Sequence, residues 1–260
     1  MEQNLFAIKN DIVAVGKRMY ERGYVASNDG NISARINKDQ VLITPTGISK
    51  GFMKTEDLII VDYNGKSISG SKKPSSEVMM HLQVYKDRPD VNSVCHSHPP
   101  YATGFAVAGI PLDKCVLPEV IIVLGGIPLI EYGTPGTEEF YKPVLPLLKD
   151  YDAFLLANHG ALTVGKDVVN AFHKMETLEH FAHIAFVAQQ LGNLNTLNKE
   201  QVQKLTDLRE KFGIRTNVGC VTRDEDTSSG AKSLVSPAID KSKEELVKKL
   251  TEEVFRQLHK

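Results

Sequence analysis

Hydrophobic residues recur at helical spacing at the start of the chain and again in its second half. Residues 4–22 place apolar side chains three and four positions apart and end before Gly23, which predicts a core-facing helix. The same spacing predicts a long helix over 167–191 and another over roughly 198–212. Each should pack one apolar face against the rest of the fold.

Short apolar runs between turn-forming residues predict β-strands in the region between these helices. Residues 41–43 and 58–61 are bounded by Gly-containing turns and are expected to form neighbouring, antiparallel strands. Similar runs predict further strands at 91–97, 120–124, 128–132 and 153–157. Strands mixed with helices predict an α/β fold in which helices surround a mixed sheet.

The pattern changes near Gly213 and divides the chain into three parts. Residues 1–215 are predicted to form the main domain. Residues 216–238 are largely small and polar, which predicts a flexible linker. Residues 239–260 combine a capping box at Ser242 with an apolar stripe, which predicts a short amphipathic helix.

Charge and composition exclude several classes of protein. The 31 Lys and Arg residues nearly balance the 32 Asp and Glu residues, so no overall basic field would attract nucleic acid or an anionic membrane. No apolar run approaches the ~20 residues of a membrane span, and no signal peptide is evident, so a cytoplasmic protein is expected. Cys95, Cys115 and Cys220 are odd in number and lack CxxC spacing, which predicts reduced thiols rather than a disulfide framework or thiolate zinc site.

Two histidines, His96 and His98, lie two positions apart on a predicted strand. Strand alternation points both imidazoles to one face, where they can share a cation. Catalytic zinc sites commonly use three protein ligands, and His159, beside Gly160 at the end of an apolar run, is the best third candidate. Two solvent-facing histidines on an edge strand would show the same spacing, so the pattern alone leaves both interpretations open.

Four other histidines lie within helical patterns, where a partly buried or exposed histidine without a ligand role is the commoner explanation. We leave them out of the predicted metal site: His81, His173, His180 and His183.

Three loops could bind an anion. Ser75 and Ser76 precede a predicted helix, whose N-terminus favours negative charge, although an ordinary helix cap is the favoured interpretation of this pair alone. Residues 29–31 and 44–47 are turns that can also present backbone N–H groups to a phosphate. Neither turn matches a P-loop or Rossmann fingerprint.

Five short motifs occur in order along residues 5–215: Gly30-Asn31-Ile32-Ser33, Thr44-Pro45-Thr46-Gly47, Ser75-Ser76-Glu77, His96-Ser97-His98 and Asn158-His159-Gly160. Together they resemble the class II aldolase and adducin family. The resemblance implies a three-layer α/β fold with a central mixed, mainly antiparallel sheet flanked by helices. It also implies a homotetramer.

The resemblance assigns roles to individual residues. His96, His98 and His159 would bind one Zn²⁺ per subunit, and Glu77 would alternate between zinc ligand and catalytic acid/base. The substrate phosphate would be held by Asn31, Thr46, Gly47, Ser75 and Ser76. Glu119 and Phe212 stand where aldolases of the family use tyrosines contributed across a subunit boundary; Glu119 could replace one as a proton donor, whereas Phe212 cannot donate a proton.

The implied activity is zinc-dependent cleavage of a deoxyketose 1-phosphate, such as fuculose 1-phosphate, to dihydroxyacetone phosphate and a small aldehyde such as lactaldehyde. Alternatives on the same scaffold are a pentulose-phosphate 4-epimerase, a ketose-phosphate dehydratase and a non-catalytic adducin-like interaction domain. Related epimerases typically carry Asp at the position of Glu77, which favours an aldolase. The three histidines count against a non-catalytic domain.

The linker and terminal helix resemble encapsulation peptides that direct enzymes into the lumen of a bacterial microcompartment. The apolar stripe would then dock on the shell or on other cargo. A terminal helix that packs on the enzyme body or on a neighbouring subunit explains the same stripe.

Overall fold

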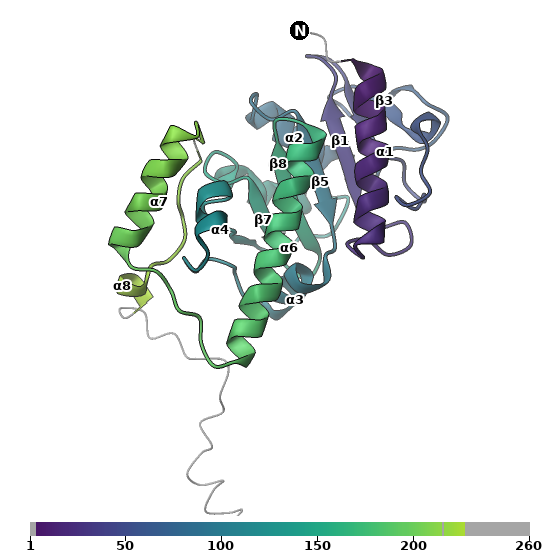
Figure 1. The fold of residues 1–260 in the computed structure, drawn as a ribbon. Coiled ribbons are helices and arrows are strands. Elements are labelled where there is room, and N and C mark those ends of the chain that lie inside the picture. Colours follow the sequence, from purple (N-terminus) through teal and green to yellow (C-terminus); the bar gives the residue numbers. More distant parts are fainter. Residues whose placement is uncertain (1–3, 215, 227–260) are drawn as a thin grey trace, which may run out of the picture.

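The computed structural model describes residues 4–214 and 216–226 (Figure 1). The helices are α1 (Leu5–Glu21), α2 (Val78–Asp87), α3 (Pro100–Ala108), α4 (Pro118–Val123), α5 (Glu138–Tyr141), α6 (Val168–Gln190), α7 (Lys199–Lys211) and α8 (Arg223–Asp226). Two 3₁₀ segments are η1 (Thr55–Asp57) and η2 (Lys142–Leu147). The strands are β1 (Asn31–Arg35), β2 (Val41–Ile43), β3 (Ile59–Val61), β4 (Ser67–Ser69), β5 (Ser93–Ser97), β6 (Leu129–Ile130), β7 (Ala153–Leu156) and β8 (Gly160–Gly165).

The eight strands form one sheet in the order β4-β3-β2-β1-β5-β8-β7-β6. Each neighbouring pair is antiparallel except β6 and β7, which are parallel. This confirms the predicted mixed, mainly antiparallel sheet. Strand β5 lies between β1 and β8, so the HxH pair does not belong to an edge strand and that alternative is wrong.

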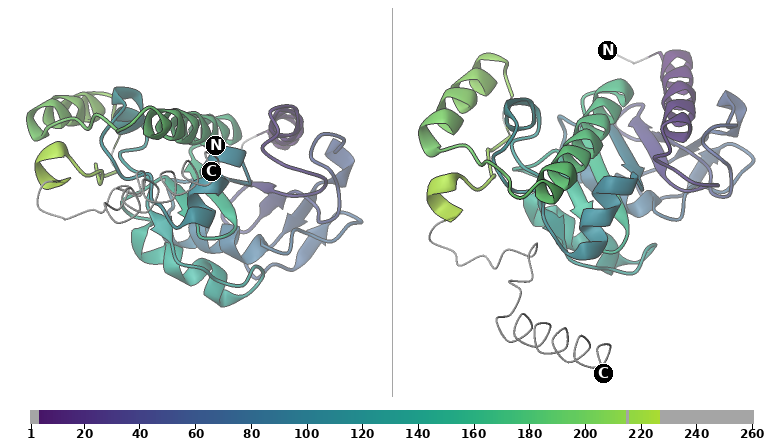
Figure 2. Two further views of the ribbon diagram at one scale, coloured as in Figure 1. Left: turned by 90° about the horizontal axis from the view of Figure 1, so that it is seen from below. Right: turned by 60° about the horizontal axis from the view of Figure 1, so that its bottom comes forward.

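Helices cover both faces of the sheet because its strands bury side chains on both sides. Leu42 and Cys95 pack in one apolar cluster with α1, α3 and α6, whereas Ile43 and Val94 pack in a second cluster with α2, α5 and η2. Figure 2 shows α1 and α6 together on one side of the sheet. Helix α1 starts where predicted, at the side chain of Asn4, which accepts the backbone N–H of Phe6 at 3.0 Å.

The strand predicted at 120–124 is wrong, because these residues lie largely in helix α4. Pro118 stands in the first turn of that helix, where its missing N–H costs nothing. Val120, Ile121 and Leu124 are buried, as a helical face requires. A short apolar run does not by itself distinguish a buried strand from one buried helical turn.

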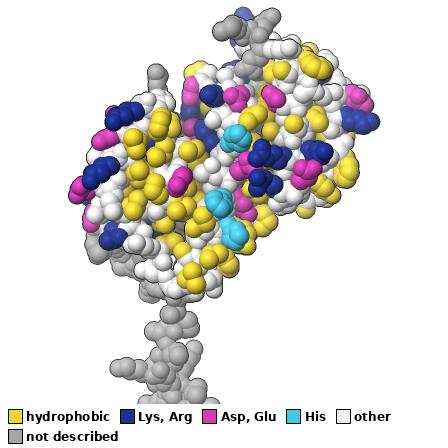
Figure 3. Space-filling model, in the orientation of Figure 1, with side chains coloured by type: hydrophobic (Ala, Val, Ile, Leu, Met, Phe, Trp, Pro, Cys, Tyr) yellow, Lys and Arg dark blue, Asp and Glu magenta, His cyan; other side chains and the backbone are white. Residues whose placement is uncertain are grey.

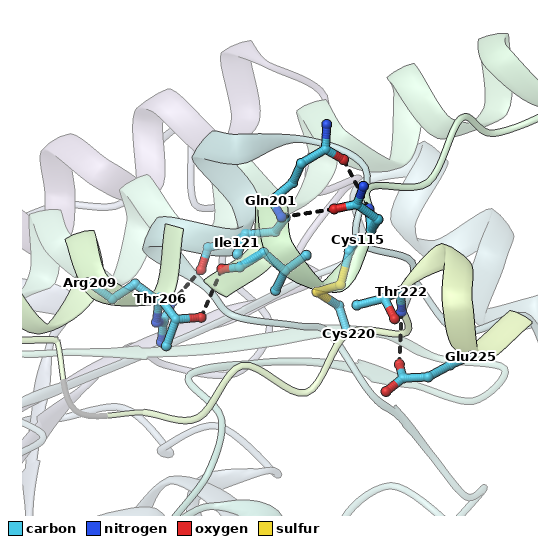
Figure 4. The surroundings of a disulfide bond; sticks show 10 residues. Cys115, Ile121, Gln201, Thr206, Arg209, Cys220, Thr222 and Glu225 are labelled. Carbon is cyan, nitrogen blue, oxygen red and sulfur yellow. Dashed lines mark hydrogen bonds between the residues drawn. A yellow bond between two sulfur atoms is a disulfide. The ribbon is translucent and has the colours of Figure 1, made fainter. Parts of the chain in front are cut away.

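The expectation of reduced thiols is also wrong for two of the three cysteines. Cys115 and Cys220 form a disulfide across 105 positions of sequence, whereas Cys95 is a buried free thiol (Figure 4). The spacing of cysteines along a sequence indicates only pairs that are close in the chain. Cys115 and Cys220 pair because the chain after α7 returns to the segment before α4. The backbone N–H of Cys115 donates to the carbonyl of Val221 at 3.0 Å, which holds residues 216–226 against the body.

No helix in the described ranges is long and apolar enough to cross a membrane. The remainder of the predicted linker, from residue 227, and the predicted helix at 239–260 lie outside the described residues.

Candidate metal centre

Three histidine side chains meet where β5 ends beside the turn between β7 and β8. His96 lies in β5, His98 lies just beyond it, and His159 lies in the turn. The Nε2 atom of His96 is 3.2 Å from Nε2 of His98 and 3.1 Å from Nε2 of His159. Their ligand atoms all lie within 4.8 Å of one another. The structure therefore brings together the three residues that the sequence predicted.

Strand alternation explains why His96 points into this site. Cys95 packs on the α6 side of the sheet and Val94 on the α2 side, so His96 also faces α2. His159 follows Asn158, whose φ of 57° makes a tight left-handed turn. Gly160 leaves the space that the rings need, because a β-carbon there would lie 2.6 Å from Cδ2 of His98.

The donor set fits a divalent cation of the zinc type. Nδ1 of His96 lies 2.8 Å from the carbonyl oxygen of Ala161, a contact in which Nδ1–H donates and Nε2 keeps its lone pair for the cluster. Burial lowers the pKa of His96 to about 3, and burial together with the nearby His159 also lowers the pKa of His98. Neutral imidazoles are the form that binds a metal, and zinc accepts three of them in catalytic sites.

Glu77 completes the cluster from the start of α2. Its Oε1 lies 3.0 Å from Nε2 of His159, and its Oε2 lies 3.3 Å from Nε2 of His96. Glu77 occupies the N-cap position of α2, one position after the predicted Ser75-Ser76 cap, and its side chain makes no capping hydrogen bond. The helix N-terminus nevertheless favours its negative charge. Burial opposes its ionisation, but the neighbouring His96 and hydrogen bonds from His159 and Asn31 outweigh burial and hold the pKa of Glu77 below the usual carboxyl range.

The loops predicted to bind phosphate converge beside Glu77. Pro45 and Pro74 form an isolated antiparallel bridge, and the backbone N–H of Ser75 donates to the carbonyl of Thr44 at 3.2 Å. The Thr44 hydroxyl in turn accepts the backbone N–H of Ile32 at 3.2 Å, which joins both loops to β1. Residues 44–47 and 73–76 therefore lie side by side, next to Asn31.

Within these loops the predicted phosphate residues differ in exposure. Asn31 and Ser75 are buried and contact Glu77: Nδ2 of Asn31 donates to Oε2 at 2.7 Å, and the Ser75 hydroxyl accepts the Glu77 backbone N–H at 3.3 Å. Thr46, Gly47 and Ser76 are exposed. Gly47 has a φ of 74°, a conformation that favours glycine.

Glu119 and Phe212 lie apart from the residues that converge on the cluster. Glu119 is exposed in the first turn of α4, and Phe212 is exposed where α7 ends. The two helices pack together through Arg209, which donates to the carbonyl of Ile122 at 2.7 Å. A role for Glu119 in a neighbouring subunit stays a prediction.

Sequence reasoning missed three residues around the site. Asp29 lies with Oδ2 3.7 Å from Nδ1 of His98, and His81 is buried next to Asn31. Lys50 is buried, and its Nζ donates to the carbonyl of Asn28, next to Asp29 in the sequence. His81 follows Glu77 by four positions on α2, and that spacing could have pointed to it. By contrast, His173, His180 and His183 are exposed on α6, and Figure 3 shows histidines at the surface of the face that carries this helix.

Comparison with known proteins identifies the class. Residues 10–186 match the family described as Class II Aldolase and Adducin N-terminal domain. The chain is 36% identical over 181 residues to an L-fuculose phosphate aldolase of Methanococcus maripaludis, covering 70% of this chain and 97% of the relative. It is 32% identical over 209 residues to a 3-oxo-tetronate 4-phosphate decarboxylase of Haemophilus influenzae, covering 79% of this chain and 95% of the relative.

A solved structure of an L-fuculose 1-phosphate aldolase superposes on the chain with a TM-score of 0.73 at 32% identity, covering 80% of this chain and 96% of the other. The chain therefore belongs to the class II aldolase and adducin family, and it is an aldolase-type lyase. Enzymes of this class depend on a metal ion, and the histidine cluster is where this chain can hold one.

Proposed function

We propose that this enzyme cleaves a deoxyketose 1-phosphate, such as fuculose 1-phosphate, to dihydroxyacetone phosphate and a small aldehyde such as lactaldehyde. One Zn²⁺ per subunit would be held by His96, His98 and His159. The observation that carries the proposal is the convergence of three imidazole nitrogens and Glu77 beside loops suited to a phosphate.

The chemistry needs a group that moves protons next to a centre of positive charge. When bound, the zinc ion supplies a Lewis acid for the oxygens next to the breaking bond. Cleavage between C3 and C4 releases the aldehyde and leaves an enediolate that must gain a proton at C3. Glu77 is ionised, largely buried and directed at the histidine nitrogens, so it is the group that can carry this proton.

The phosphate would lie against the paired loops. Thr46, Gly47 and Ser76 are exposed there and can offer backbone and hydroxyl donors. Ser75 reaches Glu77 through its own hydroxyl and would hold the loop in place. Asn31 carries a second proton on Nδ2 beyond the one given to Glu77, and it can serve the carboxylate and the phosphate together.

We place Glu119 on the aldehyde side of the reaction, acting in a neighbouring subunit of a homotetramer. Its exposure at the start of α4 leaves the carboxyl available to another chain. A carboxyl can donate a proton where the aldolases of the family use tyrosine, whereas Phe212 would pack against an apolar aldehyde tail.

A decarboxylase is the second candidate, because the chain matches a 3-oxo-tetronate 4-phosphate decarboxylase over a larger share of its length than it matches the fuculose phosphate aldolase. The same metal site could stabilise the enediolate left when carbon dioxide, rather than an aldehyde, departs. The epimerase and dehydratase alternatives would leave the phosphorylated carbon chain intact.

One assay separates these activities. Zinc-loaded protein is incubated with a panel of ketose 1-phosphates, pentulose phosphates and 3-oxo sugar-acid phosphates, and the products are resolved by mass. We expect dihydroxyacetone phosphate from a deoxyketose 1-phosphate, abolished in Glu77→Gln and retained in the exposed control Glu138→Gln. Release of carbon dioxide would instead identify a decarboxylase, and a product isomeric with its substrate would identify an epimerase. Either result would contradict the proposed reaction.

We further propose that the predicted linker at 216–238, whose first part to residue 226 is held against the body, connects the enzyme to a helix at 239–260. This helix would dock on a microcompartment shell or on other cargo, with the enzyme otherwise cytoplasmic. Deleting residues 227–260 should leave solubility and activity unchanged and abolish co-localisation with shell proteins. Loss of solubility or activity would instead assign the helix to the enzyme body.

A further inference from the structure

A line of buried hydrogen bonds runs from Glu77 into the core on the α2 side of the sheet. Nδ2 of Asn31 lies 2.7 Å from Oε2 of Glu77, and Oδ1 of Asn31 lies 2.5 Å from Nε2 of His81. Nδ1 of His81 lies 2.7 Å from the Ser33 hydroxyl, which lies 2.7 Å from the hydroxyl of Tyr85. We call this line the Glu77 chain: Glu77, Asn31, His81, Ser33 and Tyr85.

Water is largely excluded from the Glu77 chain. His81 and Ser33 are 0% exposed and Tyr85 is 1% exposed. Arg35 fixes the far end, because its guanidinium lies 5.0 Å from the centre of the Tyr85 ring and donates to the Tyr85 carbonyl at 2.8 Å. A buried polar group without a partner is costly, and the members of the chain supply one another with hydrogen-bond partners.

The Asn31 amide sets the direction of every bond in the chain. Its Nδ2 donates to Oε2 of Glu77, so its oxygen, which can only accept, faces Nε2 of His81. His81 must then carry its proton on Nε2 and accept at Nδ1. Burial lowers the pKa of His81 to about 4, so its ring is neutral and has one proton to place.

The rest of the chain follows from the His81 tautomer. Ser33 gives its single hydroxyl proton to Nδ1 of His81, and the Tyr85 hydroxyl must then donate to the Ser33 oxygen. All donors point toward Glu77, an alignment in which each bond polarises the next. With the reverse tautomer, Nε2 of His81 would be an acceptor, and the Asn31 amide would turn its oxygen to the carboxylate.

We infer that His81 is a positioning residue for Glu77 that acts through the Asn31 amide, with Ser33 and Tyr85 behind it. This inference rests on the proposed function, since it takes Glu77 as the acid/base. Asn31 joins β1 to the start of α2, and His81 prevents its amide from turning over. His81 thereby keeps one carboxylate oxygen held by Asn31 and the other directed at His159.

The first test reads the tautomer without any substrate. Long-range ¹H–¹⁵N spectra of protein labelled with ¹⁵N-histidine should show His81 with its proton on Nε2, the signal being assigned by its loss in His81→Gln. A proton on Nδ1 would overturn the inference. Because this spectrum does not depend on turnover, it stands even if the enzyme proves to use another substrate.

The second test separates positioning from packing. His81→Leu should lower kcat by about 10- to 100-fold, the usual cost of losing an outer support of a metal site, while KM and zinc content stay near wild type. His81→Gln should recover part of kcat, because its amide nitrogen can donate to Asn31 as Nε2 does. Tyr85→Phe keeps the ring and should cost less than His81→Leu.

The kinetic comparison uses only variants that fold, and the tautomer spectrum decides the matter if His81→Leu folds poorly. His81→Gln and Tyr85→Phe each keep most of the buried volume, and their folding is checked by circular dichroism. A kcat within twofold of wild type in folded His81→Leu, or equal losses in His81→Leu and His81→Gln, would overturn the inference. If wild-type protein shows the Nε2–H tautomer of His81 but is inactive on every substrate, the proposed function is wrong and the inference about His81 stands.

Discussion

Gly160 and His98 are so close that a β-carbon on Gly160 would lie 2.6 Å from Cδ2 of the imidazole. The same carbon would lie 2.6 Å from the carbonyl oxygen of Ser97, so the backbone cannot relieve the clash by moving toward β5. Only a residue without a side chain at position 160 therefore leaves room for the His98 ring, which is one of the predicted metal ligands.

Gly160→Ala should displace His98 and weaken zinc binding by at least about 10-fold, as the loss of precise ligand support does in other metal sites. Affinity is measured by competition with a chromophoric chelator. Gly104→Ala is the matched control, because nothing lies within 4 Å of a β-carbon at Gly104 in α3, and it should bind zinc like wild type. Equal affinity in both variants would contradict the geometry.

Glu119→Gln tests the carboxyl at the start of α4. If Glu119 donates a proton on the aldehyde side, its amide should lower kcat by about 10²- to 10⁴-fold with zinc content unchanged. Glu139→Gln, another exposed acid in the first turn of a helix, should keep full activity. If Glu119→Gln has the kcat of wild type, Glu119 is a surface carboxylate without a role in proton donation.

Lys50 gives the stability of the enzyme a specific pH dependence. Burial lowers its pKa from the usual 10.5 to about 8, against the opposing charges of Asp29 and Glu77. Between these values the unfolded chain binds a proton that the folded chain does not, so the Lys50 contribution to stability rises with pH through this window. Below about pH 8 the buried ammonium is charged and costs the most.

The difference in unfolding free energy between wild type and Lys50→Met isolates this contribution. It should shift in favour of wild type by on the order of 2 kcal/mol from about pH 7.5 to 9.5. Nζ also donates to the carbonyls of Asn28 and Ile48, and Lys50→Met removes both hydrogen bonds, so the change of the difference with pH, rather than its absolute size, reports the titration. A difference independent of pH would show that Lys50 titrates normally.

The Cys115–Cys220 disulfide determines how many cysteines can be alkylated before and after reduction. Without reductant, alkylation of the unfolded protein should modify Cys95 alone, and with reductant it should modify Cys95, Cys115 and Cys220. Reduction should also lower the unfolding free energy by about 2–5 kcal/mol, since the bond closes a long loop. Cys95→Ala should retain this sensitivity. Three modified cysteines in unreduced protein would exclude the bond.

Each histidine of the cluster carries a local signal, although the family motifs were needed to turn these signals into a prediction of a metal site. His96 and His98 share one face through the period of two along a strand, and His159 stands beside a glycine at the end of an apolar run. The family motifs then supplied Glu77. The hydrophobic pattern also predicted the bounds of α1, α6 and α7 to within one or two residues. Long helices repeat the spacing of their apolar residues over several turns, which makes the pattern clear.

The features that sequence reasoning missed depend on contacts between distant segments. Residues 120–124 form part of a helix because α7 packs over them, and Cys115 meets Cys220 because the chain returns past α4. His81 looked like an ordinary helical histidine until β1 brought Asn31 and Ser33 to its two nitrogens. The spacing of four positions from Glu77 could have pointed to His81, but no local pattern identifies Asn31 and Ser33 as its partners.

Metal reconstitution tests the central claim most directly. Chelator-treated enzyme is titrated with Zn²⁺, and bound metal and the rate of dihydroxyacetone phosphate formation are followed together. We predict that both rise linearly to one equivalent per chain and then level off, and that His98→Ala shows neither response. Full activity in metal-free protein, or in His98→Ala without bound zinc, would contradict a catalytic metal held by His96, His98 and His159.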